Sequence, residues 1–348
     1  ALWVSSRLSG FGLKPRTGEF RSSRSFGPGY LLTYGLALIA VALPRGPLRY
    51  AVGAAAAALG LAASRFSRFG PGTLLGRHRS RNVSVALEPR GLPAQTVCVV
   101  SHLDSSRSGL MFHPRVTPVL GKVVAAVGLA LMVQALDPLI GRKGIGRVIV
   151  WKARAMCAAA FGLVLEREVA GTYVPGANDN ASGVGACLAL ASRFSREPLE
   201  NTRLVFLFTG SEESGVLGMS EFLRSHDTED WLFVNFDGVS ADAPLRVLSK
   251  EGGPLGSVAA DPQLLELAAE VGRKHQELRA ERLEHGSGLP YDATPVLAAG
   301  GRAMSIVNQD GAIPDYHWPT DRFDRVSHPA FRRAIDFGEQ LLLELDAG

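Results

Sequence analysis

The chain has 348 residues, of which 46% are hydrophobic and 20% are charged, so it can bury a large core and form one large α/β domain or two smaller ones. This composition excludes a disordered tail and a small disulfide-stapled protein. The three cysteines, Cys98, Cys157 and Cys187, lie far apart without a Cys-x-x-Cys pair, which argues against a disulfide framework and a zinc ribbon. Any metal site must therefore use histidine and carboxylate ligands.

The net charge of +4 hides an uneven distribution along the chain. Residues 1–90 carry 13 Lys and Arg residues against two acidic residues, a net charge of +11, whereas the remainder has a net charge of −7. A basic arm is typical of proteins that bind nucleic acid or an anionic membrane surface, and an acidic remainder suits a domain that holds cations. Apolar runs stand beside the arginines and no basic and aromatic residues alternate there, so we do not expect nucleic-acid binding.

Two apolar runs, residues 30–43 and 50–63, interrupt the basic arm. Each has about 14 residues, fewer than the ~20 that a spanning helix needs. Arginine flanks and a mean hydropathy of +0.11 favour a membrane hairpin, spanning or interfacial, over two helices packed on the domain. We therefore predict a membrane-associated region over 1–70 and a second domain over 71–348, and no cleaved signal peptide. If the hairpin crosses the bilayer, its arginines favour the cytoplasmic side for the domain.

From residue 96 onward, short β-rich runs alternate with helical patterns, as in a βαβ sheet. Near-continuous apolar runs, typical of strands buried on both faces, lie at residues 96–101, 203–208, 231–236 and 303–307. Helical patterns lie near residues 181–194, 216–224, 261–274 and 328–345. We predict an α/β fold with a doubly wound, mostly parallel central sheet and helices on both faces.

Residues 106–170 do not fit a compact α/β domain. Two apolar runs, 116–136 and 148–165, flank a turn rich in Gly, Arg and Lys, and each contains internal charges. We interpret this stretch as an inserted helical hairpin. A lid or dimerisation arm and a second membrane-contacting pair are equally good interpretations.

Polar residues follow the predicted strands at the points where they end. The first strand runs into His102 and Asp104, and the second runs through a short turn into Glu212 and Glu213. The remaining candidates are Asp237 after the third strand, Asp179 at the start of a helix, and His317 beyond the fourth strand. Because ligands bind beyond the carboxyl ends of the strands in open α/β sheets, these groups should converge. They would repel each other without a cation, and a mixed nitrogen and oxygen set suits zinc, cobalt or manganese.

These motifs resemble, in order, those of the zinc aminopeptidases of the M28 type. The resemblance covers about residues 80–348 apart from the insertion, and the segment at 289–307 is similar to the family's penultimate helix and strand. The motifs are HLDS at 102–105, GANDNASG at 176–183, TGSEESGVLGM at 209–219, FDGVS at 236–240 and YHWPTDRFDRV at 316–326. The resemblance implies a zinc-exopeptidase-like α/β/α sandwich.

The resemblance also implies a role for each site residue. His102 and Asp237 would hold one zinc ion, Glu213 and His317 a second, and Asp179 would bridge them. Glu212 would stay uncoordinated as the general base, which suits the chemistry because a free carboxylate can carry a proton from water to the leaving amine. Asp104 would accept the imidazole N–H of the histidine two residues before it, and Asp321 would support the site without ligating.

The leading hypothesis is a membrane-associated dizinc aminopeptidase that hydrolyses N-terminal peptide bonds, at the bacterial cytoplasmic membrane. The sequence leaves open a glutaminyl-cyclase-like single-zinc enzyme, a carboxypeptidase or dipeptidase, and a non-catalytic relative used as an interaction module. The insertion offers a place for a subunit contact.

Overall fold

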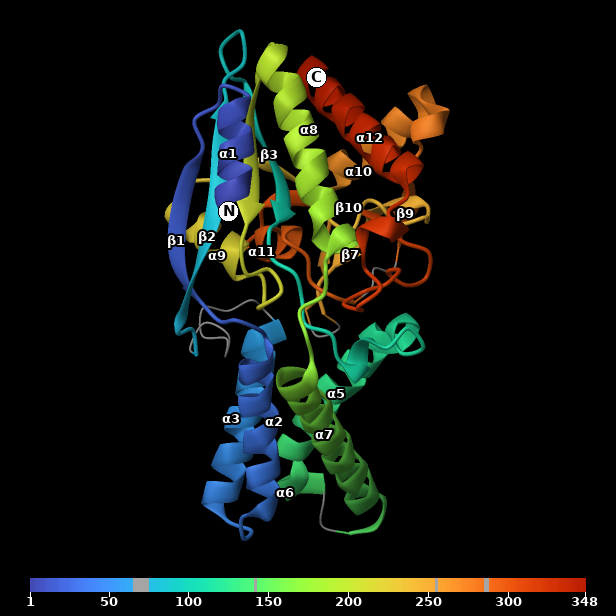
Figure 1. The fold of residues 1–348 in the computed structure, drawn as a ribbon. Helices are drawn as coiled ribbons and strands as arrows, with labels where there is room; N and C mark the ends of the chain where they lie inside the picture. The colour runs from blue at the N-terminus through green and yellow to red at the C-terminus, as the bar shows by residue number, and fades with distance from the viewer. Residues whose placement is uncertain (65–74, 141–142, 254–255, 285–287) are drawn as a thin grey trace.

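The computed structural model describes residues 1–64, 75–140, 143–253, 256–284 and 288–348. Figure 1 shows two parts, a domain built around a large sheet and a bundle of helices that projects from one end of it. The two chain termini both belong to the sheet domain. The bundle is therefore made from internal segments of the chain.

The central sheet has eight strands in the order β1-β2-β4-β3-β5-β10-β6-β9. The four middle strands, β4, β3, β5 and β10, run parallel to one another, and β1, β2 and β6 join through antiparallel pairings. The strands are β1 (Arg16–Ser22), β2 (His78–Leu87), β3 (Gln95–His102), β4 (Thr202–Thr209), β5 (Leu232–Phe236), β6 (Leu245–Leu248), β9 (Glu281–Leu283) and β10 (Arg302–Asn308), with a separate small pair, β7 (Lys250–Glu251) and β8 (Val258–Ala259). This confirms the predicted α/β class, with a mixed sheet whose parallel part is central.

Helices cover both faces of the sheet because its central strands are apolar on both sides. In β3, Val97 and Val99 belong to the larger core cluster, while Cys98 and Val100 belong to the cluster on the opposite face. The larger core includes residues from α1 (Leu2–Gly10), α8 (Gly183–Arg196), α10 (Pro262–Lys274) and α12 (His328–Ala347). The smaller core includes residues from α9 (Leu217–Ser225) and α11 (Ala293–Ala298). The predicted α/β/α sandwich is therefore present.

Two of the long helices begin at side-chain caps that the sequence contains. The Asp261 carboxylate accepts hydrogen bonds from the amides of Gln263 and Leu264 at the start of α10. Ser327 accepts from the amide of Ala330 at the start of α12. Each cap satisfies amides that lack partners within the helix, so these helices begin within a residue of the predicted positions.

The two predicted apolar hairpins form a single helical bundle. Its helices are α2 (Gly27–Ala42), α3 (Pro47–Ser64), α5 (Leu120–Ala135), the short α6 (Asp137–Ile140) and α7 (Gly144–Ala170). Helix α2 packs on α3 and α7, and α5 packs on α3 and α7. A separate core cluster with Tyr34, Ala56, Leu131, Val164 and other buried residues fills the bundle. The hairpins were predicted as separate units, and the structure joins them.

An ion cluster fastens the two hairpins together at the far end of the bundle. One carboxylate oxygen of Asp137 lies 2.5 Å from a guanidinium nitrogen of Arg49 and 3.0 Å from one of Arg154. Asp137 is buried, and all three side chains are largely shielded from solvent. A shielded carboxylate with two charged partners would be costly to separate from them. The cluster therefore resists separation of α3 from α7.

The N-terminal boundary differs from the sequence-based prediction. Residues 1–22 do not belong to the apolar arm, because β1 pairs with β2 at the edge of the sheet and α1 packs against α8. The bundle instead begins at α2, after the short connector at residues 23–26. The edge position explains why β1 was missed, since its exposed and charged sequence RTGEFRS contains no apolar run.

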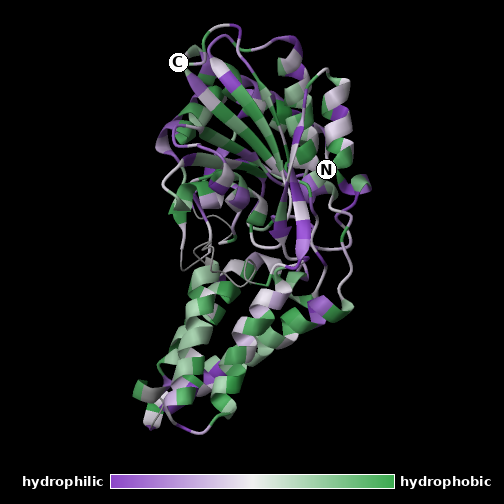
Figure 2. Cartoon of the chain, turned by 90° about the vertical axis from the view of Figure 1, so that its left-hand side faces the viewer, coloured by the Kyte–Doolittle hydropathy of each residue, from purple (hydrophilic) through white to green (hydrophobic). Residues whose placement is uncertain are grey.

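The helices of the bundle are strongly apolar along most of their length (Figure 2). Of the 24 large hydrophobic side chains that are exposed within the described residues, 17 lie between residues 27 and 64 or 110 and 170. Among the described residues, two apolar helical stretches are long enough to cross a membrane, Thr117–Ala135 and Gly144–Ala170, and only 22% of the most apolar part of each is buried inside the structure. Such exposure is unusual for a protein surrounded by water.

Candidate metal centre

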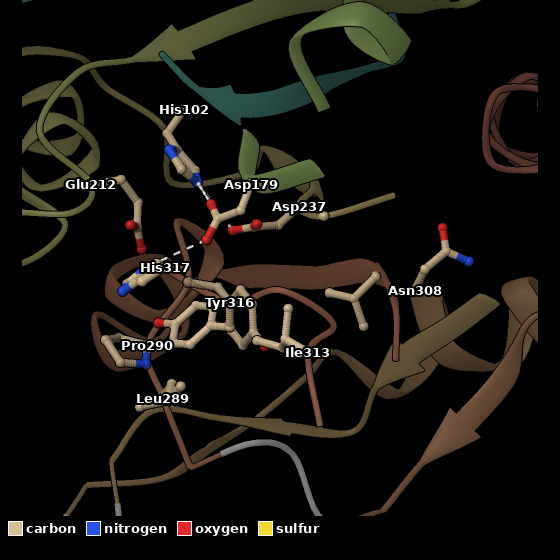
Figure 3. Close-up of a pocket in the computed structure, with 13 residues that line it drawn as sticks. His102, Asp179, Glu212, Asp237, Leu289, Pro290, Asn308, Ile313, Tyr316 and His317 are labelled. Carbon is tan, nitrogen blue, oxygen red and sulfur yellow. Dashed lines mark ion pairs between the residues drawn. The ribbon is translucent and has the colours of Figure 1, made fainter. Parts of the chain in front are cut away.

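The predicted site residues converge at the end of the sheet that faces the bundle (Figures 1 and 3). His102 ends β3, Asp237 follows β5, Asp179 precedes α8, and Glu212 and Glu213 lie in the loop after β4. His317 lies in the segment beyond β10. The parallel strands bring these groups to one edge because their carboxyl ends point the same way.

The potential ligands form two groups that share one carboxylate. One oxygen of Asp179 lies 3.2 Å from Nε2 of His102, and its other oxygen lies 3.3 Å from Nε2 of His317. Nε2 of His102 also lies 3.5 Å from Asp237, and Nε2 of His317 lies 3.0 Å from Glu213. Within each group of three residues, the ligand atoms all lie within 4.8 Å of one another. Asp179 is therefore placed between the two groups.

The chemistry of these groups fits a bound cation. All five residues are buried, and three of them are carboxylates. Oxygen Oε1 of Glu213 makes no hydrogen bond within the described residues, although it lies 3.0 Å from Nε2 of His317. Burial would raise the pKa of Asp179, but hydrogen bonds and charge interactions with the two histidines outweigh it and hold that pKa below its usual range. Imidazole nitrogens and carboxylate oxygens in this arrangement are ligands that zinc prefers.

The orientation of His102 is set by a main-chain group. Its Nδ1 lies 3.0 Å from the carbonyl oxygen of Asp104, whereas the Asp104 carboxylate is 3.9 Å away from the same nitrogen. A proton on Nδ1 that is donated to this carbonyl leaves Nε2 free to bind a metal ion. The expected hydrogen bond is made, but its acceptor is the backbone of Asp104 and not the side chain.

The Asp104 carboxylate instead supports the two glutamates. Its oxygens accept hydrogen bonds from the amides of Glu212 at 3.1 Å and Glu213 at 3.2 Å. Burial raises the pKa of Asp104 to about 6, the charge of His102 opposes that rise, and the neighbouring Glu213 adds to it. Asp104 therefore fixes the backbone from which both glutamate side chains leave.

The side chains of Asp321 and Asn180 hold the loop around Asp179 in place. Asp321 accepts from the amides of Asn178 at 2.7 Å and Asp179 at 3.1 Å, which places it in the supporting position expected for it. The Asn180 side chain accepts from the amide of Gly238 and donates to the carbonyl of Phe236. Asn180 therefore links the loop before α8 to the end of β5, a role that its sequence position did not reveal.

Glu212 stands apart from the two ligand groups. Its carboxyl end points into the same pocket as Asp179 and His317 in Figure 3, and it lines that pocket without belonging to either candidate metal group. Burial raises its pKa well above the usual range, the charge of His102 lowers it, and the neighbouring Glu213 raises it again. A free carboxylate beside two sets of metal ligands can act as a general base.

The rest of the pocket is mainly apolar. Its wall away from the ligands is formed by Leu289, Pro290, Tyr291, Val307, Ile313 and Tyr316, with Asn308 as a polar member. Tyr316 begins the motif at 316–326, and most of the other wall residues lie in the segment at 289–307, but neither pattern indicates that these side chains line a pocket. Apolar side chains and the metal ligands therefore line the same pocket (Figure 3).

The chain matches one protein family and one curated relative. The sequence model described as Peptidase family M28 matches residues 165–340, about half of the chain. A probable lipoprotein aminopeptidase, LpqL of Mycobacterium tuberculosis, is 24% identical over 183 residues. This match covers 45% of the chain and 37% of the relative, so the chain corresponds to little more than a third of the curated relative's length.

Solved structures resemble this chain in fold. A zinc aminopeptidase from Bacillus subtilis has a TM-score of 0.57 at 16% identity, and the alignment covers 99% of this chain and 88% of that structure. A glutaminyl cyclase from Fimbriiglobus ruber has a TM-score of 0.55 at 14% identity, with 100% and 86% covered. At these identities the similarity establishes the fold alone.

Proposed function

This chain belongs to peptidase family M28, and we propose that it is a zinc-dependent aminopeptidase that hydrolyses the N-terminal bond of peptides. The observation that carries this proposal is the pair of ligand groups that share Asp179, with Glu212 outside both. The B. subtilis zinc aminopeptidase and the M. tuberculosis relative support the aminopeptidase assignment.

We assign His102 and Asp237 to one zinc ion, Glu213 and His317 to a second, and Asp179 to both. When bound, zinc supplies Lewis acidity toward the peptide carbonyl and lets a nearby water lose a proton near neutral pH. The two histidines are suited to bind zinc because each directs Nε2 toward the carboxylate oxygens that would share the ion. Cobalt or manganese would suit the same donor set.

Glu212 moves the proton in this mechanism. Its carboxylate takes a proton from the attacking water and delivers it to the amine nitrogen of the leaving product. Asp104 keeps Glu212 in place through the backbone amide. The apolar wall of the pocket would receive the side chain of the first substrate residue, with its carbonyl directed toward the ligands.

Glu212 and Glu213 are neighbours with different proposed roles, so the same substitution at each position tests the two roles separately. We expect Glu212→Gln to keep its metal while kcat falls roughly 10²- to 10⁴-fold, because the base is lost. Glu213→Gln should lose affinity for one ion, because a ligand is lost. Metal content is measured by elemental mass spectrometry, and turnover is measured on peptides with free and acetylated N-termini.

The outcomes separate the competing functions. About two ions per chain and cleavage only of peptides with free N-termini would support a dizinc aminopeptidase. A single ion with cyclisation of N-terminal glutamine would favour a glutaminyl cyclase, a reaction class represented among the similar folds. Unchanged turnover in Glu212→Gln would remove Glu212 from the role of base, and a folded protein that takes up no metal would indicate an interaction module.

We also propose that the bundle attaches the enzyme to a membrane. The exposed apolar side chains of the bundle and its two long apolar helices support this assignment. The central stretches of all four long helices lack charged residues, and Arg45, Lys143, Arg147 and Lys152 are exposed near the far end. Apolar surface bounded by basic side chains is typical of protein embedded among lipids.

A further inference from the structure

His317 lacks the hydrogen bond that usually orients a metal-binding histidine. Its Nε2 faces Asp179 and Glu213, but its Nδ1 is buried and has no hydrogen-bond partner among the described residues. Its φ of 50° is left-handed, a conformation that a residue other than glycine keeps only where its surroundings impose it. His102, in contrast, is oriented through its Nδ1. Another contact must therefore orient His317.

Two aromatic rings enclose the imidazole of His317. The Tyr316 ring stacks on it with centroids 3.7 Å apart at 24°, and the Phe112 ring makes an edge-to-face contact with it, with centroids 4.4 Å apart at 74°. Tyr316 precedes His317 in the chain and moves with it. Phe112 is almost completely buried and comes from a different segment, the 3₁₀ turn Leu110–Phe112 before α5. Phe112 is therefore the external support of the imidazole.

Phe112 is itself held at the base of the bundle by Arg167. The Arg167 guanidinium lies over the Phe26 ring at 4.0 Å and 5.8 Å from the Phe112 ring. It donates to the hydroxyls of Ser25 at 2.6 Å and Ser106 at 2.9 Å. Arg167 is fully buried near the end of α7. It therefore joins the connector at residues 23–26 and the segment that follows β3 to the last turn of α7.

The end of β1 and the connector at residues 23–26 also contact the loop that contains Glu212 and Glu213. The hydroxyl of Ser22 donates to that of Ser211 at 2.7 Å, and the hydroxyl of Ser214 donates to the carbonyl of Ser23 at 2.9 Å. Ser211 and Ser214 flank the two glutamates in sequence. The segments that join the sheet domain to the base of the bundle thus contact both the loop that supplies Glu213 and the segment that supplies His317.

We propose that Phe112 is a positioning residue that holds the His317 imidazole with Nε2 directed toward the zinc ion, and that Arg167 fixes Phe112 to the bundle. The bundle then belongs to the metal site as well as to the proposed membrane attachment. The inference rests on the proposed zinc chemistry, but it requires no particular substrate. Phe112 lies outside the motifs that supply the metal ligands, so the proposal adds a residue that these motifs do not contain.

Zinc affinity tests this proposal directly. The full chain, purified in detergent and stripped of metal, is titrated with zinc against a chromophoric chelator. His317→Ala first identifies the binding step that depends on this ligand. We expect Phe112→Ala to weaken the same step by about 10- to 100-fold, the usual effect of losing an outer support, and to change any other step by less than about twofold.

Three variants separate positioning from general destabilisation. Phe112→Tyr keeps the aromatic ring and should retain near wild-type zinc affinity. Phe112→Leu fills a similar volume without an aromatic ring and should lose zinc affinity. Phe161→Ala removes an equal side chain from the bundle core beside Gly35, and should leave zinc binding unchanged.

Unchanged zinc affinity in Phe112→Ala, an equal loss in Phe161→Ala, or a wild-type chain that binds no zinc through His317 would overturn the proposal. Wild-type protein that binds zinc and shows the Phe112 effect but cleaves no peptide would refute the aminopeptidase proposal alone. The two proposals can therefore fail separately.

Discussion

At the scale of single residues, Asp104 shows how a site carboxylate can act through backbone amides. Its side chain holds the amides of Glu212 and Glu213, while its own carbonyl orients His102. A substitution that changes only the side chain should therefore affect the glutamates more than the histidine. The two functions of this residue can be separated by experiment.

We expect Asp104→Asn to lower kcat about tenfold or more, because a neutral amide offers one acceptor oxygen for two amides and so loosens the glutamate loop. Zinc held through His102 should remain, since the carbonyl that orients His102 is unchanged. Metal content and steady-state kinetics measure the two effects. The exposed Asp230→Asn is the matched control, and a loss of zinc as large as that of His102→Ala would contradict this account.

The ligand residues could be predicted from the sequence because each follows an apolar strand or lies in a motif. Their supports could not be predicted in the same way. The partners of Asp104 and Asp321 are backbone amides, which leave no trace in the side-chain pattern. Phe112 lies in a connector with no periodicity, so only the folded chain brings it to His317.

At the scale of secondary structure elements, the apolar central strands and amphipathic helices could be predicted closely. The predicted runs at 96–101 and 203–208 fall within β3 and β4. The sequence pattern does not reveal the edge strands β1 and β9 or their neighbours β2 and β6, because each is short or partly exposed. Hydropathy identified both apolar hairpins, but it contains no information on which helices pack together, so their union in one bundle was not predicted.

Because both hairpins pack together in one bundle, removal of the insertion should affect the first hairpin as well. Deleting residues 116–165 removes α5 and most of α7, and leaves the inner faces of α2 and α3 uncovered. We expect this variant to aggregate after detergent extraction, because the exposed apolar surface has lost its partners. Size-exclusion chromatography and zinc content are the measurements.

A second deletion serves as the control for the first. Removing residues 27–64 together with 116–165 takes away both hairpins and should give a more soluble chain than the single deletion. A monodisperse single-deletion variant with full zinc content would show that the insertion folds independently of the first hairpin.

At the scale of the whole molecule, the exposed surface of the bundle is far more apolar than that of the sheet domain. We expect the wild-type chain to stay in the membrane fraction after an alkaline carbonate wash. Leu129→Asp places a charge on an exposed position of α5, at a cost of roughly 2.5 to 3.5 kcal/mol if that position lies at the centre of a bilayer. This variant should be retained less well.

Leu92→Asp is the matched control, because Leu92 is exposed on the sheet domain and its replacement should not change retention. Immunoblotting of the washed membranes gives the retained fraction. Release of the wild-type chain by carbonate, together with a soluble dimer, would instead assign the apolar surface to contacts between copies of the chain.

The chain passes between the sheet domain and the bundle four times, before α2, after α3, before α5 and after α7. An enzyme tethered by one linker can be shed by a single proteolytic cut, whereas one cut in this chain would leave the fragments joined through the sheet and the helix packing. β1 lies before the first passage and is paired with β2 after the second. A single proteolytic cut therefore cannot release an intact sheet domain from the bundle.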